Sequence, residues 1–425
     1  MLLASGGHAY PALEGSWSDA RPADEGATRP GRIPHLRGWK GVGYLLRCDV
    51  MAGAISIRAV AALEAIERLA SEDLSAQAAV EEVVTRIAGV IRVDTFFAAA
   101  TDPDTGLCLG AGTCYNLAEE VCHPFWEHEF LIPDYNKFAD LAASDPVGDL
   151  RIATGGKLSR SARYRTLNAI SDLEDELRAT LHAGGRSWGN LQFNRFTGGG
   201  AFSDEDRAFL RAVAPLAGAA FRRALLEEPA HTDPGRGPGV VVLDEHGTVL
   251  SSTAEADAWL EELAESWRRY AMNINIHPEL LTLSLSTLTE AGAPTRRVRL
   301  RTLNGTWLIA HASPLAGTGQ VALMIEPAKA SEIAPIVVEA YGLTAREVEV
   351  TRLTARGLST DEIAATLFLS RHTVRDHLKA IFEKVGVSSR GELTSKLFAE
   401  HYHGPLNEGI YGSVDRVADR LSADA

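Results

Sequence analysis

Hydroxyl side chains mark the starts of helical patterns within residues 341–403, and this arrangement constrains the fold more than any other part of the sequence. Thr344, Ser359 and Ser389 are each followed three residues later by Glu. This spacing is typical of the capping box, in which a hydroxyl and a carboxylate satisfy the first unpaired amides of a helix. Ser370 is a further hydroxyl of this kind, so the segment is predicted to fold into four short helices.

Two glycines and a short apolar turn separate these predicted helices. Gly357 ends the first helix and Gly386 ends the third, because glycine readily adopts the left-handed conformation that closes a helix. Only Phe368 and Leu369 precede the Ser370 cap of the third helix, which predicts a helix-turn-helix. Apolar residues at helical spacing predict one small core made of Val350, Leu353, Ile363, Ala364, Leu367, Val374, Leu378, Ile381, Val385, Leu393 and Leu397.

The third predicted helix carries a basic stripe. Arg371, Arg375 and Lys379 follow one another at four-residue steps, so they lie on one face of the helix. The whole chain has a formal net charge of −14, whereas residues 341–403 contain 9 Lys and Arg against 8 Asp and Glu. Three cations on a helix usually form a solvated face, but on a helix-turn-helix they indicate binding to double-stranded DNA.

The stretch "LTAREVEVTRLTARGLSTDEIAATLFLSRHTVRDHLKAIFEKVGVSSRGELTSKL" resembles the LuxR/NarL-type DNA-binding domain. The resemblance implies that the helix opened by Ser370 is the recognition helix and that the helix opened by Ser389 contributes to dimer contacts. It also implies a homodimeric transcription regulator, with RNA polymerase as a further partner if the protein is an activator.

The resemblance assigns roles to residues of the recognition helix. Arg375, Asp376 and Lys379 are expected to face base edges, and Thr373 and Lys384 are expected to lie near phosphate. Arg371 and His372, at the start of this helix, are expected to touch either a base edge or a phosphate. The predicted DNA-binding residues are therefore Ser370, Arg371, His372, Thr373, Arg375, Asp376, Lys379 and Lys384.

Three residues test how far the resemblance extends. His377 matches the usual histidine of the family, but its place on the inner face of the helix favours a structural role. Val385 replaces the usual Leu, a harmless change. The acidic Asp376 stands where a neutral residue is more common, which leaves its role open between a surface charge and a base contact.

Residues 58–226 alternate helical and strand patterns and are predicted to form an α+β domain. Helices are expected at 59–69 and 74–91, and two strands are expected around the turn of "DTFFAAATDPDTGLCLGAG". The stretch "DLEDELRATLHAGGRSWGNLQFNRF" is interpreted as a helix, a Gly-Gly stop and a strand. With the following helix capped by Ser203, this block resembles a GAF sensor domain.

Residues 239–327 are predicted to form a second, smaller α+β domain. Two strands around "DEHG" precede a helix from Ala254, and three strands follow, with Asn304-Gly305 at a tight hairpin turn. This order of elements resembles the PAS fold. The fold class expected for the chain is thus multidomain, with GAF-like and PAS-like α+β domains followed by an all-α helix-turn-helix domain.

The remaining segments are expected to connect these domains. Residues 1–57 are predicted to be disordered, with translation starting at Met1 or Met51, residues 227–238 form a linker, 328–340 a linker helix and 404–425 a tail. The chain lacks a secretory signal and an apolar run of 18 residues, so a cytoplasmic protein that does not bind membranes is expected.

Three other functions have weaker support. The motif "GRSWG", residues 185–189, matches the nucleophile elbow of serine hydrolases, but the elbow requires a strand before the serine and a helix after it. Cys108, Cys114, Cys122, His123 and His128 cluster without the spacing of a zinc site, so no metal or other cofactor is predicted. A sigma-factor-like transcription subunit has a similar helix-turn-helix, but no partner domain for it is evident.

We therefore expect a sequence-specific DNA-binding transcription regulator, not an enzyme. Its N-terminal sensor domains would respond to a small molecule or to a partner protein, since no phosphate-accepting receiver domain is evident. The sequence does not identify the ligand or the residues that bind it.

Overall fold

The computed structural model describes residues 56–227, 236–268, 278–288 and 296–398. The predictions for the N-terminal segment up to residue 55, for the start site at Met51 and for the tail at 404–425 lie outside the described residues, as does most of the linker at 227–238. None of the helices within the described ranges is both long enough and apolar enough to cross a membrane.

The first α+β region is built on a five-stranded antiparallel sheet with the strand order β2-β1-β5-β4-β3. Its strands are β1 (Thr95–Thr101), β2 (Cys108–Tyr115), β3 (Val147–Asp149), β4 (Leu173–Ala183) and β5 (Arg186–Phe196). The turn between β1 and β2 is the one predicted from the Asp-Pro-Asp-Thr-Gly sequence. Successive side chains along each strand point to opposite faces, so the sheet can support a separate core on each side.

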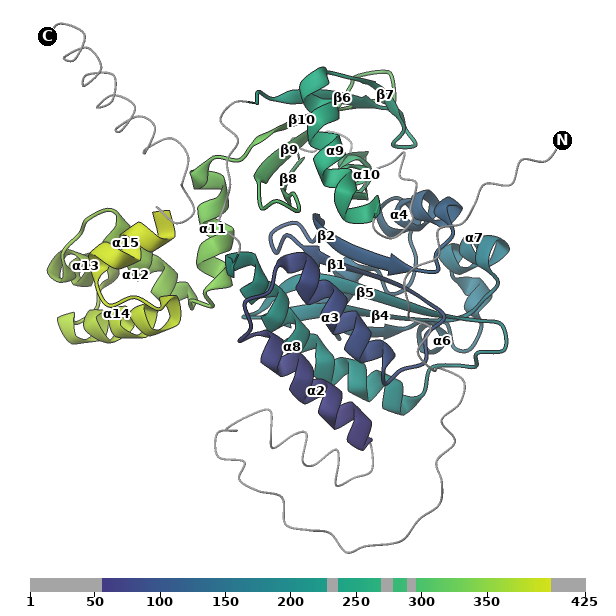
Figure 1. The fold of residues 1–425 in the computed structure, drawn as a ribbon, viewed down its shortest axis with the longest axis horizontal. Coiled ribbons are helices and arrows are strands. Elements are labelled where there is room, and N and C mark those ends of the chain that lie inside the picture. Colours follow the sequence, from purple (N-terminus) through teal and green to yellow (C-terminus); the bar gives the residue numbers. More distant parts are fainter. Residues whose placement is uncertain (1–55, 228–235, 269–277, 289–295, 399–425) are drawn as a thin grey trace, which may run out of the picture. The chain divides into compact units, whose positions relative to one another are not determined.

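Helices cover both faces of this sheet. They are α2 (Ile57–Leu69), α3 (Ala76–Ala88), α4 (Cys122–Phe130), α5 (Phe138–Ala143), α6 (Leu150–Ala153), α7 (Ala162–Ser171) and α8 (Asp204–Glu227), with short 3-10 turns at Glu119–Val121 and Leu158–Arg160. The helices α2, α3 and α8 lie side by side over one face (Figure 1). On the other face, residues of α4, α5 and α7 pack against Phe97 and Ala99.

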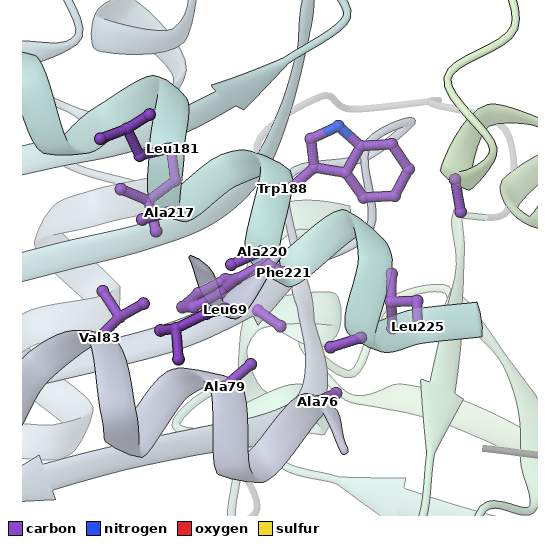
Figure 2. Packing of buried hydrophobic residues seen from close by; sticks show 14 of the residues in the cluster. Leu69, Ala76, Ala79, Val83, Leu181, Trp188, Ala217, Ala220, Phe221 and Leu225 are labelled. Carbon is purple, nitrogen blue, oxygen red and sulfur yellow. The ribbon is translucent and has the colours of Figure 1, made fainter. Parts of the chain in front are cut away.

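The core under α2, α3 and α8 depends on close approach between helix and sheet. Figure 2 shows Leu181 and Trp188 of the sheet beside Ala217, Ala220 and Phe221 of α8. A Cβ atom at Gly218 would lie 2.5 Å from the backbone of His182, so a glycine is required where α8 crosses β4.

The prediction of a helix before the Gly-Gly turn is wrong, because residues 173–183 form strand β4. Leu177, Ala179 and Leu181 are buried on one face of the sheet, which is the two-residue period of a strand. Glu176 and Arg178 lie on the opposite face of the same strand, where they are buried and ion-paired. Charged residues are rarely buried, so the sequence did not reveal that both faces of this strand are covered.

The second α+β region is also built on a five-stranded antiparallel sheet, with the order β7-β6-β10-β9-β8. Its elements are β6 (Gly239–Leu243), β7 (Val249–Ser252), α9 (Ala254–Arg268), α10 (Pro278–Leu288), β8 (Arg296–Arg301), β9 (Trp307–Pro314) and β10 (Val321–Pro327). The order of elements agrees with the prediction. Counted from its own first strand, this sheet has the same order as the first sheet.

The C-terminal part is helical, as predicted. It contains α11 (Ala330–Ala340), α12 (Ala345–Ala355), α13 (Thr360–Leu367), α14 (Arg371–Val385) and α15 (Arg390–Phe398). The predicted core residues of α12 to α15 are buried, except that Leu367 is half-buried. Arg390 connects α15 to α13, because its guanidinium donates to the carbonyl oxygen of Leu358 at 2.6 Å and to Thr360 Oγ1 at 2.9 Å.

Candidate nucleic-acid interface

Capping interactions fix the start of each helix around the candidate interface. The capping boxes predicted at Thr344 and Ser359 are both present, with Glu347 and Glu362 reaching back to the cap amides. At α15 the arrangement differs by one residue. Ser389 Oγ accepts from the Glu392 amide at 3.1 Å, but the Glu392 carboxylate accepts from the amide of Ser388 at 2.8 Å.

The turn between α13 and α14 is as short as the sequence predicts. Phe368 ends α13 in the left-handed conformation, with φ of 54°, and Ser370 caps α14 by accepting from the Thr373 amide at 3.1 Å. The hydroxyls of Ser370 and Thr373 lie 2.9 Å apart and are also hydrogen-bonded. The polar groups of this turn therefore hold the first turn of α14 in place.

Helix α14 has one buried face and one exposed face. Val374, Leu378, Ile381 and Val385 are buried against the other helices of the domain. The exposed residues are Arg371, His372, Arg375, Asp376, Lys379, Glu383, Lys384 and the Ser370 cap, while Thr373 and His377 are half-buried. The structure thus brings most of the predicted DNA-binding residues onto one accessible surface.

Two of the charged residues at the start of α14 have partners nearby. Arg371 forms an ion pair with Asp361 at the start of α13. The imidazole Nε2 of His372 lies 3.5 Å from Asp376 Oδ2, one helical turn away. Both contacts lie in solvent, where an ion pair contributes at most about 1 kcal/mol of stability. Such contacts can be exchanged for a ligand at little cost.

Arg375 and Lys379 are different, because neither forms an ion pair within the described residues. They lie one turn apart on the exposed face of α14. Two cations on one face of a helix, not neutralised by the surrounding described residues, give this face a positive charge.

Lys384 lies apart from these two cations. Its ammonium donates to Glu347 Oε2 at 2.6 Å and to the carbonyl oxygen of Gly342 at 3.3 Å. Burial raises the pKa of Glu347, but the hydrogen bonds from Lys384 and Thr344 outweigh burial and hold the pKa below its ordinary value. Lys384 therefore anchors the end of α14 to the start of α12, which the sequence did not predict.

Phe368 is a further residue whose exposure the sequence did not predict. Its side chain is 95% exposed, directly before the cap of α14. It stands between Leu367 and Leu369, which are both half-buried. Three consecutive apolar residues give no periodic signal, so the exposed one could not be identified before the turn conformation was known.

The serine of the "GRSWG" motif is not placed as in a nucleophile elbow. Ser187 lies near the start of β5, in a hairpin whose other strand is β4. The residues directly after it continue β5, whereas an elbow requires a helix there. Gly189 of the motif leaves room for Phe221, whose ring would lie 2.7 Å from a Cβ atom at this position.

The cysteine and histidine cluster is spread over β2 and α4. Burial raises the pKa of Cys108, and it raises the pKa of Cys114 to about 12, so both are protonated thiols at neutral pH. Within the described ranges, no group of three or more His, Cys, Asp or Glu side chains is arranged to hold a metal ion.

Comparison with known proteins places the similarity in the helical domain. Residues 342–397 match the family described as "Bacterial regulatory proteins, luxR family". The spore germination protein GerE of Bacillus subtilis is 42% identical over 55 residues, which cover 13% of this chain and 74% of GerE. The nitrate/nitrite response regulator protein homolog of Haemophilus influenzae is 42% identical over 59 residues, or 14% of this chain and 28% of that protein.

Other matches cover less of the related protein or show only a distant likeness. Two mycobacterial proteins described as HTH-type transcriptional regulators are 43% identical over 54 residues, and the chain spans only 6% of their length. The solved structure of Escherichia coli SdiA has a TM-score of 0.26 and 13% identity, covering 79% of this chain and 95% of SdiA. The α+β regions are therefore not assigned to a family by these matches.

Proposed function

The chain belongs to the luxR family of bacterial regulatory proteins, and we propose that it is a transcription regulator that binds specific sequences in double-stranded DNA through α14. The observation that carries this proposal is the pair Arg375 and Lys379, exposed on a capped helix that follows a three-residue turn. Such a helix fits the major groove of duplex DNA, where cations gain from neutralising phosphates.

We assign direct base contacts to Arg375, Asp376 and Lys379. These three residues are exposed within the first three turns of α14, the part of a recognition helix that usually reaches the base edges. Arginine and lysine suit the acceptors of guanine, and a carboxylate suits the amino group of cytosine. Ser370, Arg371 and His372 at the helix start would contact either bases or phosphates.

Phosphate contacts are assigned to Thr373 and Lys384. Thr373 is half-buried, and its hydroxyl is already hydrogen-bonded to that of Ser370. A phosphate oxygen would be a second hydrogen-bond partner of the Thr373 hydroxyl. Lys384 uses two of its three donors within the domain, which leaves one for the DNA backbone.

The two α+β regions are proposed as GAF-like and PAS-like sensor domains. Their support is the order of elements, two antiparallel sheets flanked by helices, ahead of the helix-turn-helix in the chain. The input would be a small molecule or a partner protein. We further propose that the protein acts in the cytoplasm as a homodimer with contacts through α15, and that an activator form would contact RNA polymerase.

Fluorescence anisotropy with a labelled duplex tests the DNA-binding role. We compare the full chain with Arg375→Ala and Lys379→Ala, and use Arg58→Ala, an exposed cation on α2, as the matched control. Each of the two α14 changes should weaken binding to the duplex. A change that also removes a phosphate contact should reduce by about 1 the slope of the logarithm of the binding constant against the logarithm of the salt concentration. The control should bind like the wild type. Equal binding by all four proteins would overturn the proposal.

A further inference from the structure

A cavity lies on the face of the first sheet opposite α2 and α8. Its empty space is about 600 Å³ when the open solvent at its mouth is counted, and side chains of β1, β5 and α4 line it. Phe97, Phe125 and Trp126 form one wall, and Gln192 and Asn194 contribute polar groups. The residues that line this cavity are separate from those of the helix-turn-helix, and none of them has been assigned a role above.

The aromatic wall is a packed cluster. The ring centroids of Phe125 and Trp126 lie 4.7 Å apart at 79°, and those of Phe97 and Trp126 lie 5.3 Å apart at 86°. Edge-to-face contacts of this kind hold the rings in fixed orientations. The wall therefore presents a preformed apolar surface to whatever enters the cavity.

The polar groups of the cavity come from one strand. Gln192 and Asn194 lie two residues apart on β5, so both side chains point to the same face, and they are only 3% and 2% exposed. In the sheet, Gln192 pairs with Phe97 on β1 and Arg178 on β4, and Asn194 pairs with Thr95 on β1. Buried amides in an otherwise apolar cavity need hydrogen-bond partners.

Arg178 fixes the orientation of both amides. A guanidinium can only donate, so the Gln192 atom 2.7 Å from Arg178 Nε must be the oxygen. The Gln192 nitrogen then donates to Asn194 Oδ1 at 3.2 Å, and the Asn194 nitrogen donates to Thr95 Oγ1 at 2.9 Å. The chain of hydrogen bonds runs in one direction, from Arg178 to Thr95.

Because the hydrogen bonds run in this direction, the groups of the two amides that still need a partner are N–H donors rather than oxygen acceptors. Each amide nitrogen carries two hydrogens, and the bonds formed by the described residues use one on Gln192 and one on Asn194. Each oxygen already accepts one bond, and a buried N–H without a partner is rarer than a carbonyl oxygen with a spare lone pair. The remaining N–H groups favour a ligand that brings an acceptor.

The rest of the lining excludes charged ligands. None of the described residues that line the cavity is an Asp, Glu, Lys, Arg or His. A charge transferred into this apolar space would lose its hydration without gaining a partner. The lining also contains Cys114, which burial keeps as a neutral thiol.

We propose that this cavity binds a small, uncharged aromatic molecule whose carbonyl or other acceptor faces Gln192 and Asn194. The proposal deepens the sensor role proposed for this region and rests on it. Arg178 acts as a positioning residue, because it orients the amides without lining the cavity itself.

A matched pair of probes tests the acceptor requirement. Acetophenone carries a carbonyl group, and α-methylstyrene has the same shape with a methylene group in place of the oxygen. Binding to the full chain is measured by ligand-observed NMR titration. Since one hydrogen bond contributes about 0.5–1.5 kcal/mol, acetophenone should bind roughly two- to thirteenfold more tightly. Equal affinity for the two probes, or no binding of either, would overturn the proposal.

Two pairs of variants locate the binding site. Asn194→Leu should reduce the affinity for acetophenone to that for α-methylstyrene, whereas Asn190→Leu, a buried asparagine on the same strand outside the cavity, should not. Ala118 is exposed at the cavity and can be enlarged without disturbing the core, so Ala118→Phe should abolish binding of both probes. The exposed Ala143→Phe on α5 is its control and should bind both.

The outcomes separate this proposal from the DNA-binding role. The same protein samples are assayed for duplex binding by anisotropy. Duplex binding without acetophenone binding would refute the cavity proposal alone, and acetophenone binding without duplex binding would refute the DNA-binding role alone. Unchanged acetophenone binding in Ala118→Phe would place the probe elsewhere and so reject the cavity.

Discussion

At the scale of single residues, Asp376 is the least expected member of the proposed DNA-binding surface. Its carboxylate lies 3.5 Å from His372 and is exposed, so it would meet the phosphates of bound DNA with an unfavourable charge. A contact with His372 on an exposed helix is worth only about 0.2–0.5 kcal/mol. A hydrogen bond from the cytosine amino group would explain an acid here better, since it also provides specificity.

Asp376→Asn distinguishes these two roles. We expect the variant to bind random duplex more tightly, because a negative charge is removed, and to lose about 1–3 kcal/mol of discrimination at one base pair. Affinities for a panel of single-base operator variants at one fixed salt concentration check this. The same ranking of variants for both proteins would show that Asp376 is only a surface charge.

Local rules predicted the residues of the helical domain well. Caps at Thr344, Ser359 and Ser370 depend on neighbours within three residues, and the structure confirms them. The partner of Lys384 could not be predicted in this way, because Glu347 lies 37 residues away in the sequence. Contacts between residues so far apart in the sequence depend on how the helices pack, which helical periodicity does not specify.

At the scale of elements, the contact between Lys384 and Glu347 fastens α14 to α12. The Glu347 side chain is 7% exposed, and it also accepts from the Thr344 amide at 2.7 Å. One carboxylate thus serves both the cap of α12 and the attachment of α14 to it. Its loss should loosen both elements.

Glu347→Ala should lower the free energy of local unfolding of α12 by about 1–2 kcal/mol, the usual cost of losing a cap together with a partly buried partner. Amide hydrogen exchange of α12 in the full chain measures this. Glu349→Ala is the control, since Glu349 is exposed and forms a surface ion pair with Arg346, so its effect should stay within about 0.5 kcal/mol. Equal effects of the two changes would contradict the assigned role.

The same carboxylate predicts a dependence on pH. The pKa of Glu347 is lower in the folded protein than its ordinary value of 4.5, so the ionised form stabilises the fold. The difference between wild type and Glu347→Ala should therefore be constant above pH 4.5. It should shrink as the pH falls through the lower folded pKa, and a difference that grows on acidification would contradict this account.

The sheet elements show where sequence patterns fail. The succession of strands and helices along the second α+β region was predicted, because turn residues such as Asn304 and Gly305 mark its hairpins. Strand β4 was mistaken for a helix. Its charged residues Glu176 and Arg178 are buried by helices from separate parts of the sequence, and no local pattern indicates that burial. Pairing between β4 and β5, not local propensity, determines this element.

Gly218→Ala tests the close contact between α8 and β4. The added Cβ would lie 2.5 Å from the His182 backbone, so the helix must move, and we expect a loss of about 1–3 kcal/mol in unfolding free energy. At Gly89, which ends α3 with φ of −70°, the nearest atom would be 3.4 Å away. Gly89→Ala is therefore the control and should be neutral within about 1 kcal/mol. Thermal denaturation compares the two, and a stable Gly218→Ala protein would contradict the packing argument.

At the scale of the whole molecule, residues 342–397 match the luxR family, and the α+β regions precede them in the chain. The charge pattern agrees with this division, because the chain is acidic overall while the helical domain is nearly neutral and exposes its cations on α14. An acidic surface outside the helical domain would disfavour non-specific contacts of the α+β regions with nucleic acid.

The central claim is that α14 reads a specific DNA sequence. Incubating the full chain with fragments of the DNA of its own organism, recovering the bound fragments and sequencing them tests this claim directly. The account predicts that the wild-type protein enriches fragments sharing one short sequence, and that Arg375→Ala loses this enrichment while Arg58→Ala keeps it. Recovery of fragments without any shared sequence, or the same enrichment by Arg375→Ala, would contradict it.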